Sequence, residues 1–483
     1  MTDYGITAYG AYVPRLRLER ASIAAAHKWM APSLRSLGKG ERAFCCWDED
    51  SITMAVEAAR DAFGAAPREG IGALTLASTT LPYADLQNSV IAIGALALGE
   101  AVSGIDIAGS QRAGLAGLSR ALDAGGADQM LLAADRPRAK PASTQEMTYG
   151  AGAAAFRLGH GEVIARKLGG ATVAAQFIDH FRATGQAHDY FWEERWIRDE
   201  GYAKIVPQAA KAALEQAGLA VDDLSVMVMA SPLKGSAEMI ARKIGFSGRI
   251  ADPLNDQLGY AGTAHPLLML AGELEQARPG DRILVLAFGQ GAEALILEVT
   301  DAIGGFRPAR GLSGAIADKV STTDYLRMLS FYDELDAEWG MRSEKSGKAA
   351  LTTLYREADQ LSAFVAGKCG QCGTVQFPQL AYCVNPACKA PAAQFSQEPL
   401  SDQPASVLTF TGDWLSYYPA PPLYVGFVQF DLGARLLMEI VDVGPEGLEV
   451  GTPLRMTYRI KEPDKLRGFN RYFWKATPVA TGA

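Results

Sequence analysis

The 483-residue sequence has little cysteine and no long apolar run, and each shortage excludes a class of protein. Six cysteines, four of them in one short segment, do not make a disulfide framework. No window approaches the roughly 18 apolar residues that a membrane-spanning helix needs, and the first residues lack the basic and apolar regions of a signal peptide. We therefore expect a cytoplasmic protein without a membrane partner.

Positive charge is also scarce. Lys and Arg total 46 against 54 Asp and Glu, which gives a formal net charge of -8. A nucleic-acid binder displaces counterions with a basic surface, and the sequence has no such stripe, so we expect no nucleic-acid partner. What the sequence does have is the length for several domains and 48% hydrophobic residues to fill their cores.

The first 300 residues alternate short apolar runs with helical patterns, which is typical of a layered α/β domain. A helix is expected over 52–63, with Asp50 among the residues that cap its start. Two stretches, 113–156 and 266–295, each contain a helix, an apolar strand and a Gly-x-Gly-Ala turn before a second strand. They predict an internal duplication, the alternative being chance similarity between two common units.

The C-terminal third changes in character. We expect a linker over 305–362, with a helical stretch at 323–339, then a cysteine-rich module over 363–394. Residues 395–483 contain short alternating segments broken by Gly and Pro, which favour a small closed β-barrel. These predicted strands are 406–411, 423–430, 435–441 and 453–459.

The cysteine-rich module predicts a structural zinc site. Cys369 and Cys372 lie on one tight turn, Cys383 and Cys388 on another, and the segment between them lets the turns face each other. Four thiolates satisfy tetrahedral zinc and leave no open position for catalysis. The alternatives are two redox dithiols or a ribbon that has lost its metal, but nothing nearby resembles a thioredoxin unit.

Two family resemblances follow from these features. Segments 5–14, 48–59, 150–156 and 280–285, with Pro82-Tyr83, resemble hydroxymethylglutaryl-CoA synthase and the β-ketoacyl synthase III group of the thiolase superfamily. This resemblance implies a duplicated five-layered α/β fold, with halves at 1–165 and 166–304, and a homodimer. From Tyr325 to the C-terminus the chain resembles the rubredoxin-like zinc-ribbon and OB-fold proteins that accompany thiolase-superfamily enzymes.

The resemblance also shows where this chain departs from the family. Alignment on the nucleophile turn puts Gln111 where the synthases have a cysteine, and a carboxamide does not attack a thioester. The catalytic glutamate of the family falls at Thr79, the histidine near Ala230 and the asparagine near Leu258. The resemblance therefore implies the fold and a coenzyme A thioester substrate, without the covalent machinery.

Polar residues in the loops that the family places around the pocket are candidates for a new role. Gln111, at the start of a buried helix, is expected to polarise the thioester. The other candidates for catalysis are Tyr83, Asp85, Tyr260, His265 and Ser110, and those for binding the coenzyme A phosphates are Lys234 and Arg112. Each has an ordinary alternative, such as filling a loop or lying solvated on the surface.

Three functions remain open from the sequence. The first is an aldolase-type enzyme that makes or breaks a C–C bond beside a CoA thioester without an acyl-enzyme, served by a partner hydratase or dehydrogenase. The second is a synthase-type acyltransferase, with Cys45 and Cys46 the only thiols outside the zinc site. The third is a non-catalytic acyl-CoA-binding scaffold. An aromatic-rich insertion at 179–202 either lines an acyl pocket or packs at a dimer interface.

Overall fold

The computed structural model describes residues 4–344 and 350–479, which fold into two compact units. The first unit contains the described residues up to 45, residues 50–90 and residues 100–329. The second contains residues 46–49 and 91–99 and the described residues from 330 onward. Across the described ranges, none of the helices combines the length and the apolar character that crossing a membrane requires.

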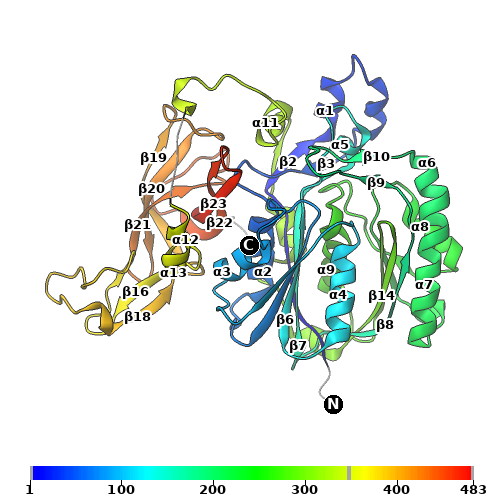
Figure 1. Ribbon diagram of the computed structural model, residues 1–483, viewed down its shortest axis with the longest axis horizontal. Coiled ribbons are helices and arrows are strands. Elements are labelled where there is room, and N and C mark those ends of the chain that lie inside the picture. Colours follow the sequence, from blue (N-terminus) through cyan, green and yellow to red (C-terminus); the bar gives the residue numbers. More distant parts are fainter. Residues whose placement is uncertain (1–3, 345–349, 480–483) are drawn as a thin grey trace. The chain divides into compact units, whose positions relative to one another are not determined.

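A ten-stranded sheet is the centre of the first unit (Figure 1), in the order β12-β11-β13-β14-β8-β1-β7-β6-β4-β5. In chain order its strands are β1 Tyr4–Tyr12, β4 Ile71–Ala77, β5 Ser103–Ile107, β6 Asp128–Asp135, β7 Gly152–His160, β8 Ala165–Ala174, β11 Val226–Met229, β12 Arg249–Ile250, β13 Arg282–Phe288 and β14 Gly291–Val299.

This order consists of two halves with the same arrangement. β5-β4-β6-β7-β1 and β12-β11-β13-β14-β8 each have three parallel strands followed by two antiparallel pairings. The halves meet where β1 pairs with β8, at Ile6 and Ala165. The topology confirms the predicted internal duplication.

Helices complete the layers. α4 (Ala113–Ala124) and α9 (His265–Gln276) contact each other and strands of both halves, whereas α2 (Ser51–Phe63) packs on β1 and β7, and α7 (Ala203–Ala217) on β8 and β14. Figure 1 shows α4 and α9 between the two halves of the sheet, so the predicted five-layered α/β domain is confirmed. The other α-helices that lie wholly in this unit are α1 Arg20–Ala26, α5 Thr144–Thr148, α6 Glu194–Trp196, α8 Ser236–Ile244 and α10 Gly311–Ala317. α3 Asn88–Ala95 and α11 Tyr325–Phe331 begin in residues of the first unit and end in residues of the second.

The predicted helix at 52–63 is confirmed together with its cap. Asp50 Oδ1 accepts hydrogen bonds from the backbone N–H groups of Ile52 and Thr53, each at 3.0 Å, which satisfies two donors that a helix start leaves free. The expected helical stretch at 323–339 is too long. α11 ends at Phe331, because Asp333 adopts a positive φ of 57°, which no helix continues.

The two Gly-x-Gly-Ala turns lie against the opposite half of the domain. A Cβ atom on Gly150 would lie 1.8 Å from the carbonyl oxygen of Leu258, and the Gly150 N–H donates to Tyr260 O at 2.9 Å. A Cβ atom on Gly289 would lie 2.8 Å from Ser110 Oγ. At Gly150 only glycine permits such close approach to the backbone, whereas at Gly289 a side chain would displace the Ser110 hydroxyl. Each turn thus holds the loop that precedes the central helix of the other half.

Shorter elements complete the first unit. A three-stranded sheet joins β15 Val320–Thr322, β2 Leu16–Glu19 and β3 Glu41–Ala43, and a two-stranded ribbon joins β9 His180–Phe181 and β10 Tyr190–Phe191.

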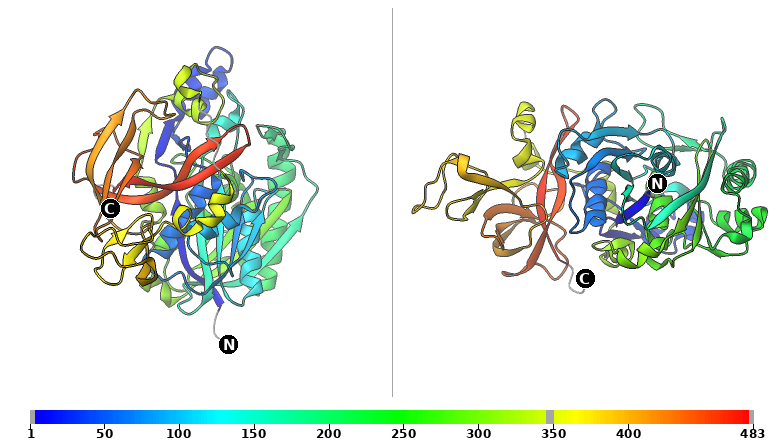
Figure 2. Two further views of the ribbon diagram at one scale, coloured as in Figure 1. Left: turned by 60° about the vertical axis from the view of Figure 1, so that its left-hand side comes forward. Right: turned by 90° about the horizontal axis from the view of Figure 1, so that it is seen from below.

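The second unit contains a zinc ribbon and a barrel. The ribbon strands are β16 Val365–Cys369, β17 Val375–Gln376 and β18 Phe395–Pro399, preceded by α12 Thr352–Arg356 and α13 Ala358–Leu361. The barrel closes in the order β19-β20-β21-β23-β22 (Figure 2), with strands β19 Ala405–Asp413, β20 Leu423–Phe430, β21 Arg435–Ile440, β22 Pro453–Asp464 and β23 Phe469–Pro478. The four predicted strands are confirmed. The fifth, β23, was not among them because its buried positions include Lys475 and Thr477, which interrupt the apolar pattern.

Candidate functional site

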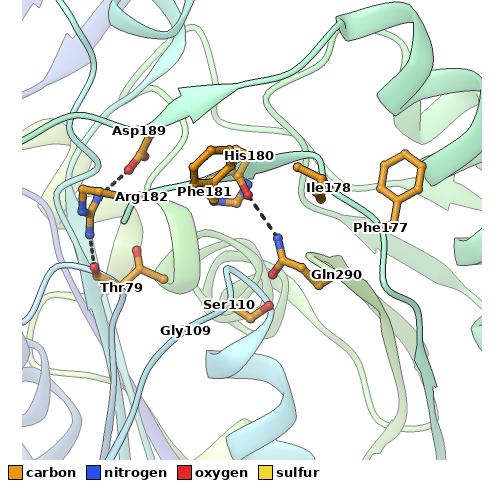
Figure 3. A pocket seen from close by; sticks show the side chains of 10 residues that line it. All are labelled: Thr79, Gly109, Ser110, Phe177, Ile178, His180, Phe181, Arg182, Asp189 and Gln290. Atoms are coloured by element: carbon orange, nitrogen blue, oxygen red, sulfur yellow. Dashed lines mark hydrogen bonds and ion pairs between the residues drawn. The ribbon is translucent and has the colours of Figure 1, made fainter. Parts of the chain in front are cut away.

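A cavity of about 360 Å³ lies in the first unit, where the loops before α4 and after β13 face the ribbon β9–β10. Figure 3 shows the side chains that surround it. They are Thr79, Gly109, Ser110, Phe177, Ile178, His180, Phe181, Arg182, Asp189 and Gln290. The positions that the family resemblance assigned to the glutamate and to the neighbour of the nucleophile, Thr79 and Ser110, therefore share one cavity.

A histidine–carboxylate pair lies at the wall of this cavity. His180 Nδ1 is 2.7 Å from Asp179 Oδ2, and Asp179 Oδ1 accepts from Gln290 Nε2 at 2.5 Å. Burial alone would lower the pKa of His180, but Asp179 and Asp189 outweigh burial and raise it above its usual value. Nε2 of His180 has no partner among residues 4–344 and 350–479, so this nitrogen is free to exchange a proton with a ligand.

An arginine–carboxylate pair lies beside the histidine. Arg182 forms an ion pair with Asp189 and donates to the carbonyl oxygen of Thr79 (Figure 3). Burial raises the pKa of Asp189, although Arg182 and His180 oppose the shift. The buried Tyr149 lies close enough for Asp189 to affect it, since burial and then Asp189 raise the pKa of Tyr149 well above its usual value.

A second buried carboxylate, Asp135, fixes the strand end that carries Thr79. Asp135 is fully buried at the end of β6. It accepts from Thr79 N and Thr79 Oγ1, both at 2.9 Å, and from Thr263 N at 2.8 Å. Ser78 and Thr80 hydroxyls also donate to it. Because Thr263 precedes α9 and Thr79 follows β4, Asp135 ties the two halves together below the cavity.

The predicted residues Gln111 and Tyr260 are in contact. The hydroxyl of Tyr260 donates to Gln111 Oε1 at 3.1 Å, which leaves the amide N–H groups of Gln111 as its donors. Gln111 is buried and does not line the cavity, whereas its neighbour Ser110 does. Ser110 Oγ donates to Gly289 O at 2.9 Å.

His265 is fully buried at the start of α9. Its Nδ1 accepts from the N–H of Ala261 at 3.1 Å and its Nε2 donates to Pro253 O at 2.8 Å. Burial lowers the pKa of His265 to about 4. Both ring nitrogens are therefore used within the protein, which favours the interpretation that His265 fills a loop.

The remaining candidates lie outside the cavity lining. Tyr83 is partly buried, and its N–H donates to Asn88 Oδ1, while Asp85 is exposed. Lys234 is exposed, and Arg112 forms an ion pair with Glu293 at 3.3 Å. Their catalytic and binding roles stay predictions.

The two remaining cysteines are also absent from the cavity lining. Cys45 is buried and its Sγ lies 3.8 Å from Met54 Sδ on α2, an outer helix of the first unit. Cys46 belongs to the second unit, where its N–H donates to Glu49.

The four ribbon cysteines form a candidate metal centre. Their sulfur atoms all lie within 4.8 Å of one another, with Cys369–Cys388 at 3.7 Å and Cys372–Cys383 at 3.5 Å. Four sulfurs placed about 2.3 Å from a tetrahedral zinc would be separated by about 3.8 Å. The residues therefore fit zinc, and the closed four-thiolate set suits a structural ion.

The fold and these two sites define a thiolase-type α/β domain joined to a zinc ribbon and a five-stranded barrel. The chain belongs to the hydroxymethylglutaryl-CoA synthase family: it is 32% identical over 339 residues to the hydroxymethylglutaryl-CoA synthase of Methanopyrus kandleri, an alignment that covers 67% of this chain and 96% of that protein. Residues 356–392 match the family described as ChsH2, rubredoxin-like zinc ribbon domain, which confirms the predicted ribbon.

Solved structures agree on the fold. An HMG-CoA synthase complexed with CoA matches with a TM-score of 0.60 at 16% identity, covering 72% of this chain and 95% of that one. The 3-oxoacyl-(acyl carrier protein) synthase III, FabH, of Pseudomonas aeruginosa matches with a TM-score of 0.55 at 20% identity, covering 62% of this chain and 98% of that one.

Sequence reasoning missed the polar residues that the segment around β9 and β10 brings to the cavity, namely His180, Arg182 and Asp189, and it missed Asp179, the partner of His180. One signal was available, because His180 is one of only five histidines and follows an aspartate directly.

Proposed function

We propose that this protein is an enzyme that makes or breaks a C–C bond next to a coenzyme A thioester without forming an acyl-enzyme. One observation carries the proposal. The cavity is lined by His180, whose Nδ1 pairs with Asp179, and none of its ten lining residues is a cysteine. Membership of a CoA-thioester family supports the substrate class, and the glutamine at the nucleophile position supports chemistry in which the thioester is polarised.

In the cleavage direction the substrate is a β-hydroxyacyl-CoA. His180 Nε2 takes the proton of the β-hydroxyl group, and the oxygen lone pair forms the carbonyl of the first product while the Cα–Cβ bond breaks. The bonding electrons pass to Cα and delocalise into the thioester as an enolate. The His180 imidazolium returns its proton to Cα, which gives the shortened acyl-CoA and restores the neutral base. The reverse sequence forms the bond.

The enolate oxygen needs donors, and the start of α4 supplies them. Tyr260 occupies Gln111 Oε1, which leaves the Gln111 amide nitrogen as a donor next to the positive end of the helix dipole. Gln111 does not line the cavity but follows Ser110, which does, so the proposal requires the Gln111 side chain to turn toward the thioester oxygen when substrate binds. Ser110 lines the same cavity. We expect Gln111→Ala to lower kcat/KM about 100-fold, as loss of one such donor typically does.

A second candidate function is acyl transfer, which the family membership favours. Ser110 and His180 line the same cavity, which is the arrangement that a serine nucleophile and its base would need. The Ser110 hydroxyl, however, donates to Gly289 O, so its proton is directed away from the imidazole.

Radiolabelled acyl-CoA distinguishes the two functions. After incubation and denaturation, the aldolase-type reaction leaves no label on the protein while labelled products accumulate, whereas acyl transfer leaves label that Ser110→Ala abolishes. His180→Gln should lower turnover at least 100-fold, and His160→Gln, which changes an exposed histidine at the end of β7, should not. Retained label in the wild type would refute the proposal.

We further propose that the chain works in the cytoplasm as a homodimer, and that a hydratase or dehydrogenase produces or consumes its β-hydroxyacyl-CoA. Fusion to the zinc ribbon and barrel keeps these modules at high effective concentration, which helps if both units serve one substrate.

A further inference from the structure

Large aromatic side chains extend from the cavity over residues 177–196. Phe177, Ile178 and Phe181 line the cavity itself. Phe181 pairs with Tyr190 across the ribbon β9–β10, and their rings lie 5.3 Å apart. Tyr190 in turn lies 6.4 Å from Trp192. We call Ile178, Phe181, Tyr190 and Trp192 the aromatic ribbon.

These side chains are unusually exposed for their size. Ile178, Phe181, Tyr190 and Trp192 are each between 49% and 57% exposed. Single exposed apolar side chains are normal, but a contiguous group that begins inside a cavity is typical of a binding surface. Its position next to His180 and Asp189 points to a part of the substrate as its occupant.

Phe177, which lines the cavity next to the aromatic ribbon, is held in place. Phe177 stacks on Trp196 with a ring separation of 5.8 Å and an interplanar angle of 5°, and it packs edge-on against Phe288. Trp196 is followed by the π-helix Ile197–Tyr202, in which a Cβ atom on Gly201 would lie 2.9 Å from the Phe177 ring. Phe177 is thus a fixed apolar wall next to the polar catalytic groups.

We infer that the aromatic ribbon binds the acyl group of the substrate, and that this acyl group carries a planar ring system rather than a short aliphatic chain. The inference rests on the proposed function for its substrate type and goes further by naming the acyl class. Planar rings gain from stacking on Phe181 and Tyr190 in addition to the area that they bury, whereas a short chain beside His180 would leave Tyr190 and Trp192 in water.

Binding of unreactive thioesters tests the inference apart from catalysis. 3-Phenylpropanoyl-CoA and butanoyl-CoA lack a β-hydroxyl group, so neither can be cleaved by the proposed reaction. Calorimetry should show the phenyl compound binding about tenfold more tightly to the wild type. That ratio should fall below about two in Phe181→Ala. It should persist in Trp29→Ala, which removes an 80% exposed tryptophan elsewhere in the first unit.

The outcomes distinguish an error in the acyl assignment from an error in the proposed reaction. Equal binding of the two thioesters by the wild type, or a ratio unchanged in Phe181→Ala, would overturn the acyl assignment. If Trp192→Ala instead halves the mass measured by sedimentation and leaves the binding ratio unchanged, the aromatic ribbon is an interface between two copies of the chain and the inference is wrong. A preserved ratio without cleavage of any β-hydroxyacyl-CoA would refute the proposed reaction and leave the acyl assignment standing.

Discussion

The pKa of the proposed base, His180, depends on the neighbouring carboxylate of Asp179. The proposed base must be neutral, so kcat/KM should rise with pH through a pKa above the usual histidine value of about 6.5. Asp179→Asn removes a group that raises the pKa of His180, so the rising limb of the pH profile should move to lower pH. The profile of kcat/KM between pH 5 and 9 measures this shift.

Asp123→Asn is the matched control for this experiment. Asp123 is an exposed carboxylate of α4 that pairs with Lys167, so its loss should leave the limb unchanged. If the rising limb of the kcat/KM profile stays in place in Asp179→Asn, or moves to higher pH, His180 is not the titrating base.

At the residue scale, the sequence identified only some of the residues that line the cavity. Family resemblance led to Ser110 and Thr79, which line the cavity, and to Gln111, which does not, because these positions precede or follow regular elements that the family shares. His180 lies in an insertion with no periodic pattern, and the hydrogen bond from Gln290 to Asp179 joins residues 111 positions apart. Such a contact depends on the fold, so local sequence does not predict it.

Metal removal tests the zinc ribbon at the scale of an element. Cys383→Ala should lower the zinc content from about one ion per chain to near zero, because three thiolates hold zinc far less tightly than four. Since metal binding and folding of such a module are coupled, the variant should also become sensitive to proteolysis between residues 363 and 399. Elemental analysis and limited proteolysis measure the two effects.

Cys45→Ala provides the comparison, since it removes a buried thiol that lies against Met54 and outside the cluster. It should keep the full zinc content. Loss of zinc from both variants would mean that the metal does not depend on the ribbon cysteines.

Elements were predictable where their pattern is local. The cysteine spacing and the capped helix at 52–63 are short-range signals, and both agree with the structure. The helix predicted to reach Trp339 ends at Phe331 because of one residue with positive φ. Strand β23 was missed because two of its buried positions are polar, Lys475 and Thr477, and the ion-pair partners of the Lys475 ammonium group lie elsewhere in the chain.

At the scale of the whole molecule, the duplication was visible in the sequence because both halves repeat one order of elements. The contacts that join distant segments were not visible in the sequence. In the second unit, Lys475 of β23 is buried and forms ion pairs of 2.9 Å with Asp48 and with Glu439. Asp48 and Lys475 are 427 positions apart, and the ammonium group also lies 4.5 Å from the ring centre of Trp47.

Lys475→Met should therefore destabilise the protein by about 3–5 kcal/mol, because it leaves the buried Asp48 without its ion-pair partner. Glu439 is partly buried and keeps its ion pair with Lys461. Urea unfolding measures the loss. Lys465→Met is the control, since the pair of Lys465 with Asp333 is exposed and its loss should cost at most about 1 kcal/mol. Equal losses in the two variants would contradict the assignment.

The pH dependence of this loss has a definite sign. Burial alone would raise the pKa of Asp48, but Lys475 and Arg459 hold it below its usual value, so in the wild type Asp48 stays ionised and its contribution is lost only in acid. In Lys475→Met one of the two positive charges that lower the pKa of Asp48 is lost, so burial raises this pKa. Protonation at mildly acidic pH then removes the buried unpaired charge. The difference in unfolding free energy between wild type and variant should consequently be smaller at pH 5 than at pH 8, and a difference that grows toward pH 5 would show that the ion pair is not its origin.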